Sequence, residues 1–159
     1  MKGVRWLADL GIGAFLFGAD RLAKGIALTS LSQGVMRPVG SLAGVRLAWT
    51  LTYNEGAAWG IFDAIPIVLL LFRCFFIGLL LFVYRSSSTS MLSKTAVAVI
   101  LAGAVGNIMD SFVYGHVIDM IHVNLWGWNY PVFNLADAEI CLGVAWLILA
   151  RFFPEKRTG

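Results

Sequence analysis

The chain has 159 residues, of which 59% are hydrophobic and only 13% are charged, a balance far from that of soluble globular proteins. It indicates a membrane protein with one integral-membrane domain spanning residues 1–159. The formal net charge of +3 gives no reason to expect a nucleic-acid partner, because in a membrane chain the placement of basic residues matters more than their sum. Cys74 and Cys141 lie in apolar runs and indicate neither a disulfide framework nor a metal site.

Four apolar segments predict an all-α membrane protein with four transmembrane helices, at about 6–26, 61–84, 94–109 and 135–153. A crossing needs about 20 residues, a length that the second and fourth segments reach, whereas the third is short. We expect the first segment to be a retained helix and not a cleaved signal peptide, because Asp9 interrupts it and further spans follow.

Basic residues divide between the two sides of these segments. One side carries Lys2, Arg5, Arg85, Lys94, Arg151, Lys156 and Arg157, and the other carries Arg21, Lys24, Arg37 and Arg46. The positive-inside bias therefore predicts that both termini are cytoplasmic. The loops at about 30–60 and 111–134 would then lie on the outer side, together with the polar residues at the adjoining ends of the spans.

The first outer loop contains a strand pattern. Apolar residues occupy every second position from Val45 to Tyr53, which predicts a strand with one apolar and one polar face. Glycines and Pro38 upstream supply turns, so we expect a small β-sheet or hairpin on the outer membrane surface. Its apolar face would lie on lipid, on a lipid-bearing substrate, or on the helix bundle.

Two aspartates, Asp119 and Asp137, lie beside apolar runs, where burying a lone carboxylate costs several kcal/mol. Two carboxyl groups that share one proton can activate water against an amide bond. Asn134 has the position of a helix N-cap, with Asp137 in the third helical position, where the helix dipole favours a carboxylate. We therefore expect Asp137 to ionise more readily and Asp119 to hold the shared proton.

Two further features concern the spans. Small residues at Ala98, Ala102 and Gly106 form one stripe of the third segment, which predicts close helix packing. Arg73, inside the second segment, is expected to form a structural pair, with Asp9 as its candidate partner.

The two histidines, His116 and His122, stand three residues before and after Asp119. On a helix such residues would spread around the surface and would not converge, so we expect no metal site.

Five motifs occur in order along the chain. They are Asp20-x-x-x-Lys24, Asn54-Glu55-Gly56-Ala57-Ala58, Gly106-Asn107-Ile108-Met109-Asp110, Gly115-His116-Val117-Ile118-Asp119 and Phe133-Asn134-Leu135-Ala136-Asp137. Together they resemble the motif set of bacterial lipoprotein signal peptidase, with the same layout of four spans. Each motif alone is weak, whereas five in order are hard to obtain by chance.

The resemblance implies an intramembrane aspartyl endopeptidase that needs no metal and no cofactor. It would remove the signal peptide from diacylglyceryl-modified prolipoproteins, cutting before the lipidated cysteine, in the lipid of the bacterial cytoplasmic (inner) membrane and near its outer face. The resemblance makes Asp119 and Asp137 the catalytic pair. It implies substrate-binding or supporting roles for Asp20, Lys24, Asn54, Gly56, Asn107, Asp110 and Asn134.

The chain departs from this family where arginine usually follows Asp110, because it has Ser111 there. Arg21, which follows Asp20, is a candidate for the compensating cation, and on that hypothesis Arg21→Gln alone would cripple cleavage. Glu139 is also unexpected, and two helical positions from Asp137 it is predicted to point away from the pair.

Two other functions remain open from the sequence. A small proton-coupled membrane transporter would also place acids in a membrane, but it predicts acids spread through the bilayer depth and often an internal repeat. A catalytically weak family member would bind lipoprotein precursors without cutting them. Ser111 favours this second alternative, and the presence of both aspartates opposes it.

Overall fold

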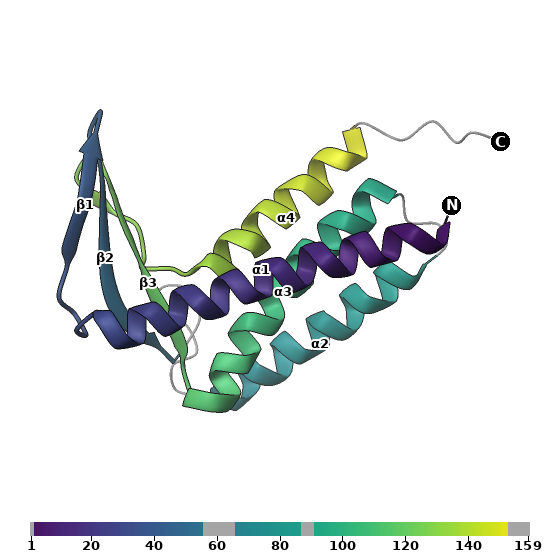
Figure 1. The fold of residues 1–159 in the computed structure, drawn as a ribbon, viewed down its shortest axis with the longest axis horizontal. Helices are drawn as coiled ribbons and strands as arrows, with labels where there is room; N and C mark the ends of the chain where they lie inside the picture. The colour runs from purple at the N-terminus through teal and green to yellow at the C-terminus, as the bar shows by residue number, and fades with distance from the viewer. Residues whose placement is uncertain (1, 56–65, 87–90, 153–159) are drawn as a thin grey trace.

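The computed structural model describes residues 2–55, 66–86 and 91–152. The elements follow in the order α1 (Lys2–Ser30), β1 (Arg37–Leu42), β2 (Val45–Asn54), α2 (Pro66–Arg85), α3 (Met91–Tyr114), β3 (Val117–Leu125), β4 (Trp128–Asn129) and α4 (Leu135–Phe152). The four helices form a bundle, and the sheet stands at one end of it (Figure 1). α1 begins and α4 ends at the opposite end of the bundle.

The helices agree in position with the four predicted segments, but two of them are longer than expected. α1 covers Lys2–Ser30, where the prediction was about 6–26. The third segment was expected to be short, ending at Met109, but α3 continues to Tyr114 and has 24 residues. Within the described ranges, one helical stretch, Ser93–Tyr114, is both long and apolar enough to cross a membrane by length and composition alone.

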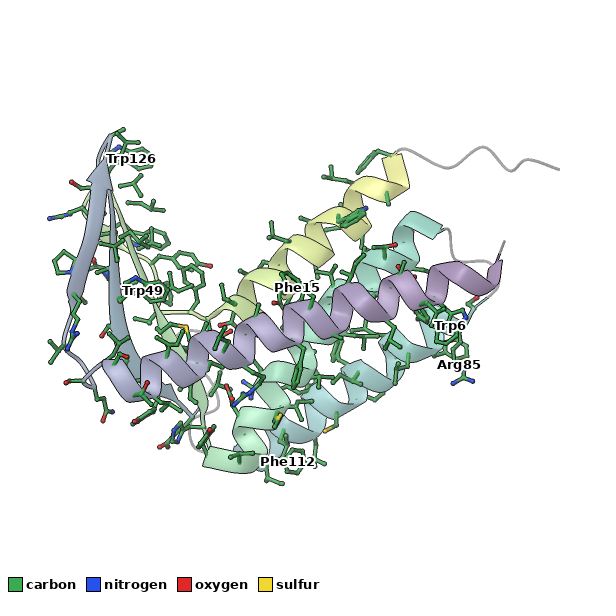
Figure 2. All side chains as sticks on the ribbon, in the orientation of Figure 1. Trp6, Phe15, Trp49, Arg85, Phe112 and Trp126 are labelled. Atoms are coloured by element: carbon green, nitrogen blue, oxygen red, sulfur yellow. The ribbon has the colours of Figure 1, made fainter. Side chains whose placement is uncertain are left out.

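The bundle has a polar interior and an apolar exterior. Asp20, Lys24 and Asn134 are fully buried, whereas Phe15 is 74% exposed and Phe112 is 69% exposed. Figure 2 shows these two phenylalanines on the outside of the bundle. Large apolar side chains on the outside and charges on the inside suit a bundle whose surroundings are lipid.

Small residues let the helices approach closely, as the stripe in the third segment predicted. α3 packs against α1, α2 and α4. At Gly106 an added Cβ atom would lie 2.8 Å from Oδ2 of Asp20 and 3.5 Å from the Cβ of Ala136. A larger residue at this position would therefore separate α3 from both α1 and α4.

The predicted strand at Val45–Tyr53 is confirmed as β2, but the sheet is larger than expected. It is antiparallel and has the order β1-β2-β3-β4. The second outer loop supplies β3, which the sequence analysis did not predict. The assumption of a helix around Asp119 is therefore wrong, because Asp119 lies in the strand Val117–Leu125.

The sequence of β3 shows no clear alternation of apolar and polar residues, because both faces of the strand are covered. Ile118 and Met120 are fully buried and pack in a cluster with Ala27 of α1 and Leu51 of β2. Asp119 lies between them in the strand, so its side chain points to the other face. A strand buried on both faces reads as an apolar run in the sequence and not as a period of two.

Candidate active site

Asp119 is placed by the pairing of β2 with β3. Asn54 pairs with Val117 and Thr52 pairs with Asp119, so Asn54 and Asp119 are diagonal neighbours on one face of the sheet. Nδ2 of Asn54 donates to Oδ2 of Asp119 at 2.9 Å. The Asp119 side chain is almost fully buried.

Asp137 is placed by the start of α4. The Asp137 backbone N–H donates to Oδ1 of Asn134 at 2.8 Å, and the Asn134 backbone N–H donates to Oδ2 of Asp137 at 3.2 Å. This reciprocal pair is a capping box, with Asn134 as the N-cap, as the sequence predicted. Nδ2 of Asn107, on α3, donates to the other oxygen of Asp137 at 2.8 Å.

Asn134 connects the two aspartates. While its backbone and Oδ1 bind Asp137, its Nδ2 donates to Oδ1 of Asp119 at 2.7 Å. The same Nδ2 lies within hydrogen-bonding distance of the carbonyl oxygen of Ile118, at 3.2 Å, and of Oδ1 of Asn107, at 3.1 Å. One buried amide thus holds the strand acid and the helix acid in a common site.

The backbone before α4 is also fixed to the sheet. Phe133 forms a bridge with Ile121, in which each backbone N–H donates to the other's carbonyl, at 3.0 and 2.8 Å. The N–H of Met120 donates to the Phe133 carbonyl as well, at 3.1 Å. These bonds hold the residue that precedes Asn134 against β3, so the positions of the two aspartates depend on each other.

Lys24 of α1 lies at the centre of a buried charge cluster. Its Nζ is 2.8 Å from Oδ2 of Asp20, 2.7 Å from Oδ2 of Asp110 and 3.0 Å from Oδ1 of Asn107. Asp20 and Lys24, four residues apart on α1, therefore form an ion pair, and both side chains are fully buried. The contact with Oδ2 of Asp20 is an ion pair without hydrogen-bond geometry, whereas Nζ donates a hydrogen bond to Oδ1 of Asn107.

The remaining carboxylate oxygens of this cluster bind backbone and Arg21. Oδ1 of Asp20 accepts from the backbone N–H of Ala136 at 3.0 Å, in the first turn of α4, where the helix dipole favours an anion. Asp110 accepts from the backbone N–H of Ile118 at 3.3 Å and forms an ion pair with Arg21. The cluster therefore joins α1 and α3 to the start of α4 and to β3.

Burial raises the pKa of Asp119 to about 7, from an ordinary value near 4. The negative charge of Asp137 is the second cause, because two nearby carboxylates disfavour each other's ionisation. Hydrogen bonds from Asn54 and Asn134, and the charge of Lys24, oppose the rise. The assignment of the shared proton to Asp119, with Asp137 as the more readily ionised member, stays a prediction.

The structure brings together the predicted residues that it describes. Those that meet through the contacts above are Asp20, Arg21, Lys24, Asn54, Asn107, Asp110, Asp119, Asn134 and Asp137. Gly56 lies outside the described residues.

Arg73 does not have the partner that the sequence analysis expected. Its guanidinium donates from NH1 to Oγ of Ser111 at 2.9 Å. Asp9 instead accepts from Tyr84 and Thr95. Thr95 and Ser111 are 16 residues apart on α3, which separates them by about 24 Å along the helix axis. The sequence showed a cation inside a span, but it did not show at which depth its partner lies.

The two remaining questions concern Glu139 and metal binding. Glu139 is buried near Asp20 and Lys24, on the α1 side of the cluster. Across the described residues, no group of three or more His, Cys, Asp or Glu side chains is arranged to hold a metal ion.

A membrane helix bundle with a buried pair of carboxyl groups at one end is the class of protein that this fold and site define. The sequence model described as Signal peptidase (SPase) II matches residues 12–153. The chain belongs to the signal peptidase II family.

Two named relatives and one solved structure are similar to this chain. The lipoprotein signal peptidase of Chlamydia pneumoniae is 41% identical over 108 residues, which are 67% of this chain and 64% of that protein. The lipoprotein signal peptidase of Chlamydia trachomatis serovar D is 41% identical over 107 residues, 66% of this chain and 64% of that protein. The aligned part is thus slightly less than two thirds of these relatives' length. A structure described as a bacterial membrane enzyme at 2.3 Å resolution superposes with a TM-score of 0.81 at 26% identity, covering 96% of this chain and 93% of that one.

Proposed function

We propose that the chain is an aspartyl endopeptidase of the membrane that removes signal peptides from diacylglyceryl-modified prolipoproteins. The observation that carries the proposal is the binding of both Asp119 and Asp137 by Asn134. This amide connects an acid with a raised pKa to an acid at a helix N-terminus. Two carboxyl groups in such different surroundings can act as acid and base in one reaction.

The reaction follows from the two protonation states. The Asp137 carboxylate takes a proton from water, whose oxygen attacks the scissile carbonyl carbon. The Asp119 carboxyl gives its proton to the carbonyl oxygen, so no full negative charge develops there. When the tetrahedral intermediate breaks down, the C–N bond cleaves and the leaving amine takes the proton from Asp137. One hydroxyl group of the intermediate returns a proton to Asp119 as the new carboxyl group forms, so both aspartates recover their starting states.

The other residues support this pair in different ways. Asn54 and Asn107 each orient one aspartate through a hydrogen bond. Lys24 holds Asn107 and the carboxylates of Asp20 and Asp110, so it fixes α1 against α3. Arg21 holds Asp110, and we assign Gly56 a role in admitting the substrate backbone, because glycine lets another chain approach closely.

The arrangement of the elements supports four membrane spans with one functional face. The start of α1, the end of α4 and Arg85 lie at the end of the bundle away from the sheet, as Figure 2 shows for Trp6 and Arg85. The positive-inside bias puts that end in the cytoplasm. The acids of the site then lie near the outer face of the bacterial inner membrane, together with the sheet and its exposed Trp49 and Trp126. A proton-coupled transporter would instead need acids along the whole span.

The substrate class can be tested with matched precursors. Purified protein in detergent, with a chelator present, is mixed with a diacylglyceryl-modified precursor and with the same precursor lacking the lipid. We expect a product that begins at the lipidated cysteine from the first precursor and little or none from the second. Equal cleavage of both would contradict the lipid requirement, and no cleavage of either by folded protein would contradict the proposed activity and favour a family member that binds precursors without cutting them.

A further inference from the structure

We propose that Arg73 is the positioning cation of the aspartate pair, the group that balances the single negative charge left when Asp119 and Asp137 share one proton. This inference rests on the proposed function. It concerns a residue on α2, a helix that contributes no other side chain to the site described above.

The position of Arg73 is the first support. Arg73 is half-buried, seven residues after the start of α2, and its NH1 donates to Oγ of Ser111 in the last turn of α3. Ser111 in turn donates to the carbonyl oxygen of Asn107 at 3.0 Å, and Asn107 donates to Asp137. The guanidinium is thus connected to the helix acid through Ser111 and Asn107, with the backbone carbonyl of Asn107 binding Ser111 and its side-chain amide binding Asp137.

The charges of the cluster are the second support. On the α1 side, two cations face two carboxylates, because Lys24 contacts Asp20 and Asp110, and Arg21 contacts Asp110. These four charges cancel. The charge of Lys24 also acts on both aspartates, but from within a set whose net charge is zero, and Arg73 lies outside that set.

Glu139 of α4 does not change this balance. One of its carboxyl oxygens has no hydrogen-bond partner among the described residues, and it is buried, which favours its neutral form. The pair of Asp119 and Asp137 carries one negative charge when it shares one proton. Arg73 is the cation of α2 whose side chain reaches α3 beside the site, where the carboxylates of Asp137, Asp119 and Asp110 attract its guanidinium.

A guanidinium within a membrane span is costly unless an anion compensates it. The same attraction lowers the free energy of the singly charged pair relative to the pair with two protons. Removal of Arg73 should therefore make the second proton bind more readily, at a higher pH. The structure also gives Ser111 a function, since a serine at this position, where the family resemblance leads one to expect arginine, leaves room for a cation from α2.

The test compares pH–rate profiles for cleavage of the lipidated precursor. Arg73→Gln is expected to move the acidic limb upward by about one pH unit, so that activity on that limb falls about tenfold. Arg73→Lys, which keeps the charge with fewer donors, should leave the limb near its wild-type position even where the maximal rate falls. Arg85→Gln removes the same side chain from an exposed site on the same helix and should change nothing.

A rescue variant separates charge from packing. Arg73→Leu combined with Ser111→Arg moves the cation from α2 to α3 and should restore the acidic limb that Arg73→Leu alone displaces. If the limb is unmoved in Arg73→Gln, or in Arg73→Leu should the glutamine variant fail to fold, the assignment is wrong while the proposed function stands. If folded wild-type protein does not cleave at all, the proposed function and the assignment both fall.

Discussion

Nδ2 of Asn134 donates to Oδ1 of Asp119 at 2.7 Å, across a gap of 15 positions in the sequence that separates a strand from a helix cap. The same residue exchanges two hydrogen bonds with Asp137. Its side chain is therefore both a structural cap and a part of the site. This double use makes it the most informative single position to alter.

Asn134→Ala should reduce cleavage by about a hundredfold or more, because both aspartates lose a bond that orients them. Loss of the cap should also destabilise the protein by about 1 kcal/mol. The measurement is the pH–rate profile, in which the acidic limb should move. Asn124→Ala is a matched control, because Asn124 is a buried asparagine of β3 that forms hydrogen bonds with Arg46, Asn129 and Gly127. An unmoved acidic limb in Asn134→Ala would count against the assignment of the proton to Asp119.

Asp119→Asn should abolish cleavage and yet change stability in a pH-dependent way. The folded-state pKa of Asp119, about 7, lies above its unfolded value near 4. Between these values the folded protein binds a proton that the unfolded chain does not, so wild-type stability falls as the pH rises from about 4 to about 7. The amide has no proton to lose. Thermal unfolding in detergent should therefore favour the variant more at pH 8 than at pH 4.5, and a difference independent of pH would refute the raised pKa.

Lys24→Met should destabilise the protein strongly, by about 3–5 kcal/mol, because it leaves Asp20 and Asp110 buried without their shared cation. Thermal unfolding in detergent measures this change. Adding Asp20→Asn to Lys24→Met should recover part of the loss, since one buried charge is then removed. Lys94→Met, at a partly exposed site on α3, serves as the control and should alter stability little. A small effect of Lys24→Met would mean that the charge cluster does not hold the bundle.

Arg21→Gln tests which of two cations, Arg21 or Arg73, compensates for Ser111. Arg21 pairs with Asp110, and the Arg73 guanidinium bonds to Ser111, so we assign compensation for Ser111 to Arg73 and the holding of Asp110 to Arg21. We expect Arg21→Gln to lower the maximal rate severalfold and to leave the acidic limb in place. A crippled enzyme whose acidic limb is displaced would instead support the first hypothesis, in which Arg21 compensates for Ser111.

Local signals predicted much of this site. The spacing of Asn134 and Asp137 contains the capping box, and the spacing of Asp20 and Lys24 contains the ion pair, because both depend on one helix. The alternation of apolar and polar residues from Val45 predicted β2, because this pattern also depends on a single element. Contacts within one element need no knowledge of how the chain folds back.

Contacts between elements were harder to predict. β3 was missed because polar residues occur on both of its faces, with Asp119 on one and His122 and Asn124 on the other, so polarity does not alternate along the strand. The partner of Arg73 was wrong because apolar spans do not show the depth at which two polar residues lie. Both errors concern contacts between elements that are distant in the sequence, and the periodicity of a single segment does not predict such contacts.

The most direct test of the central claim is cleavage of a diacylglyceryl-modified precursor by purified wild-type protein, Asp119→Asn and Asp137→Asn in detergent with a chelator, read by the mass of the product. We predict that wild-type protein releases a product beginning at the lipidated cysteine and that each variant, folded to the same extent, releases less than about one thousandth as much. Substantial cleavage by either variant would contradict the assignment of these two aspartates as the catalytic pair.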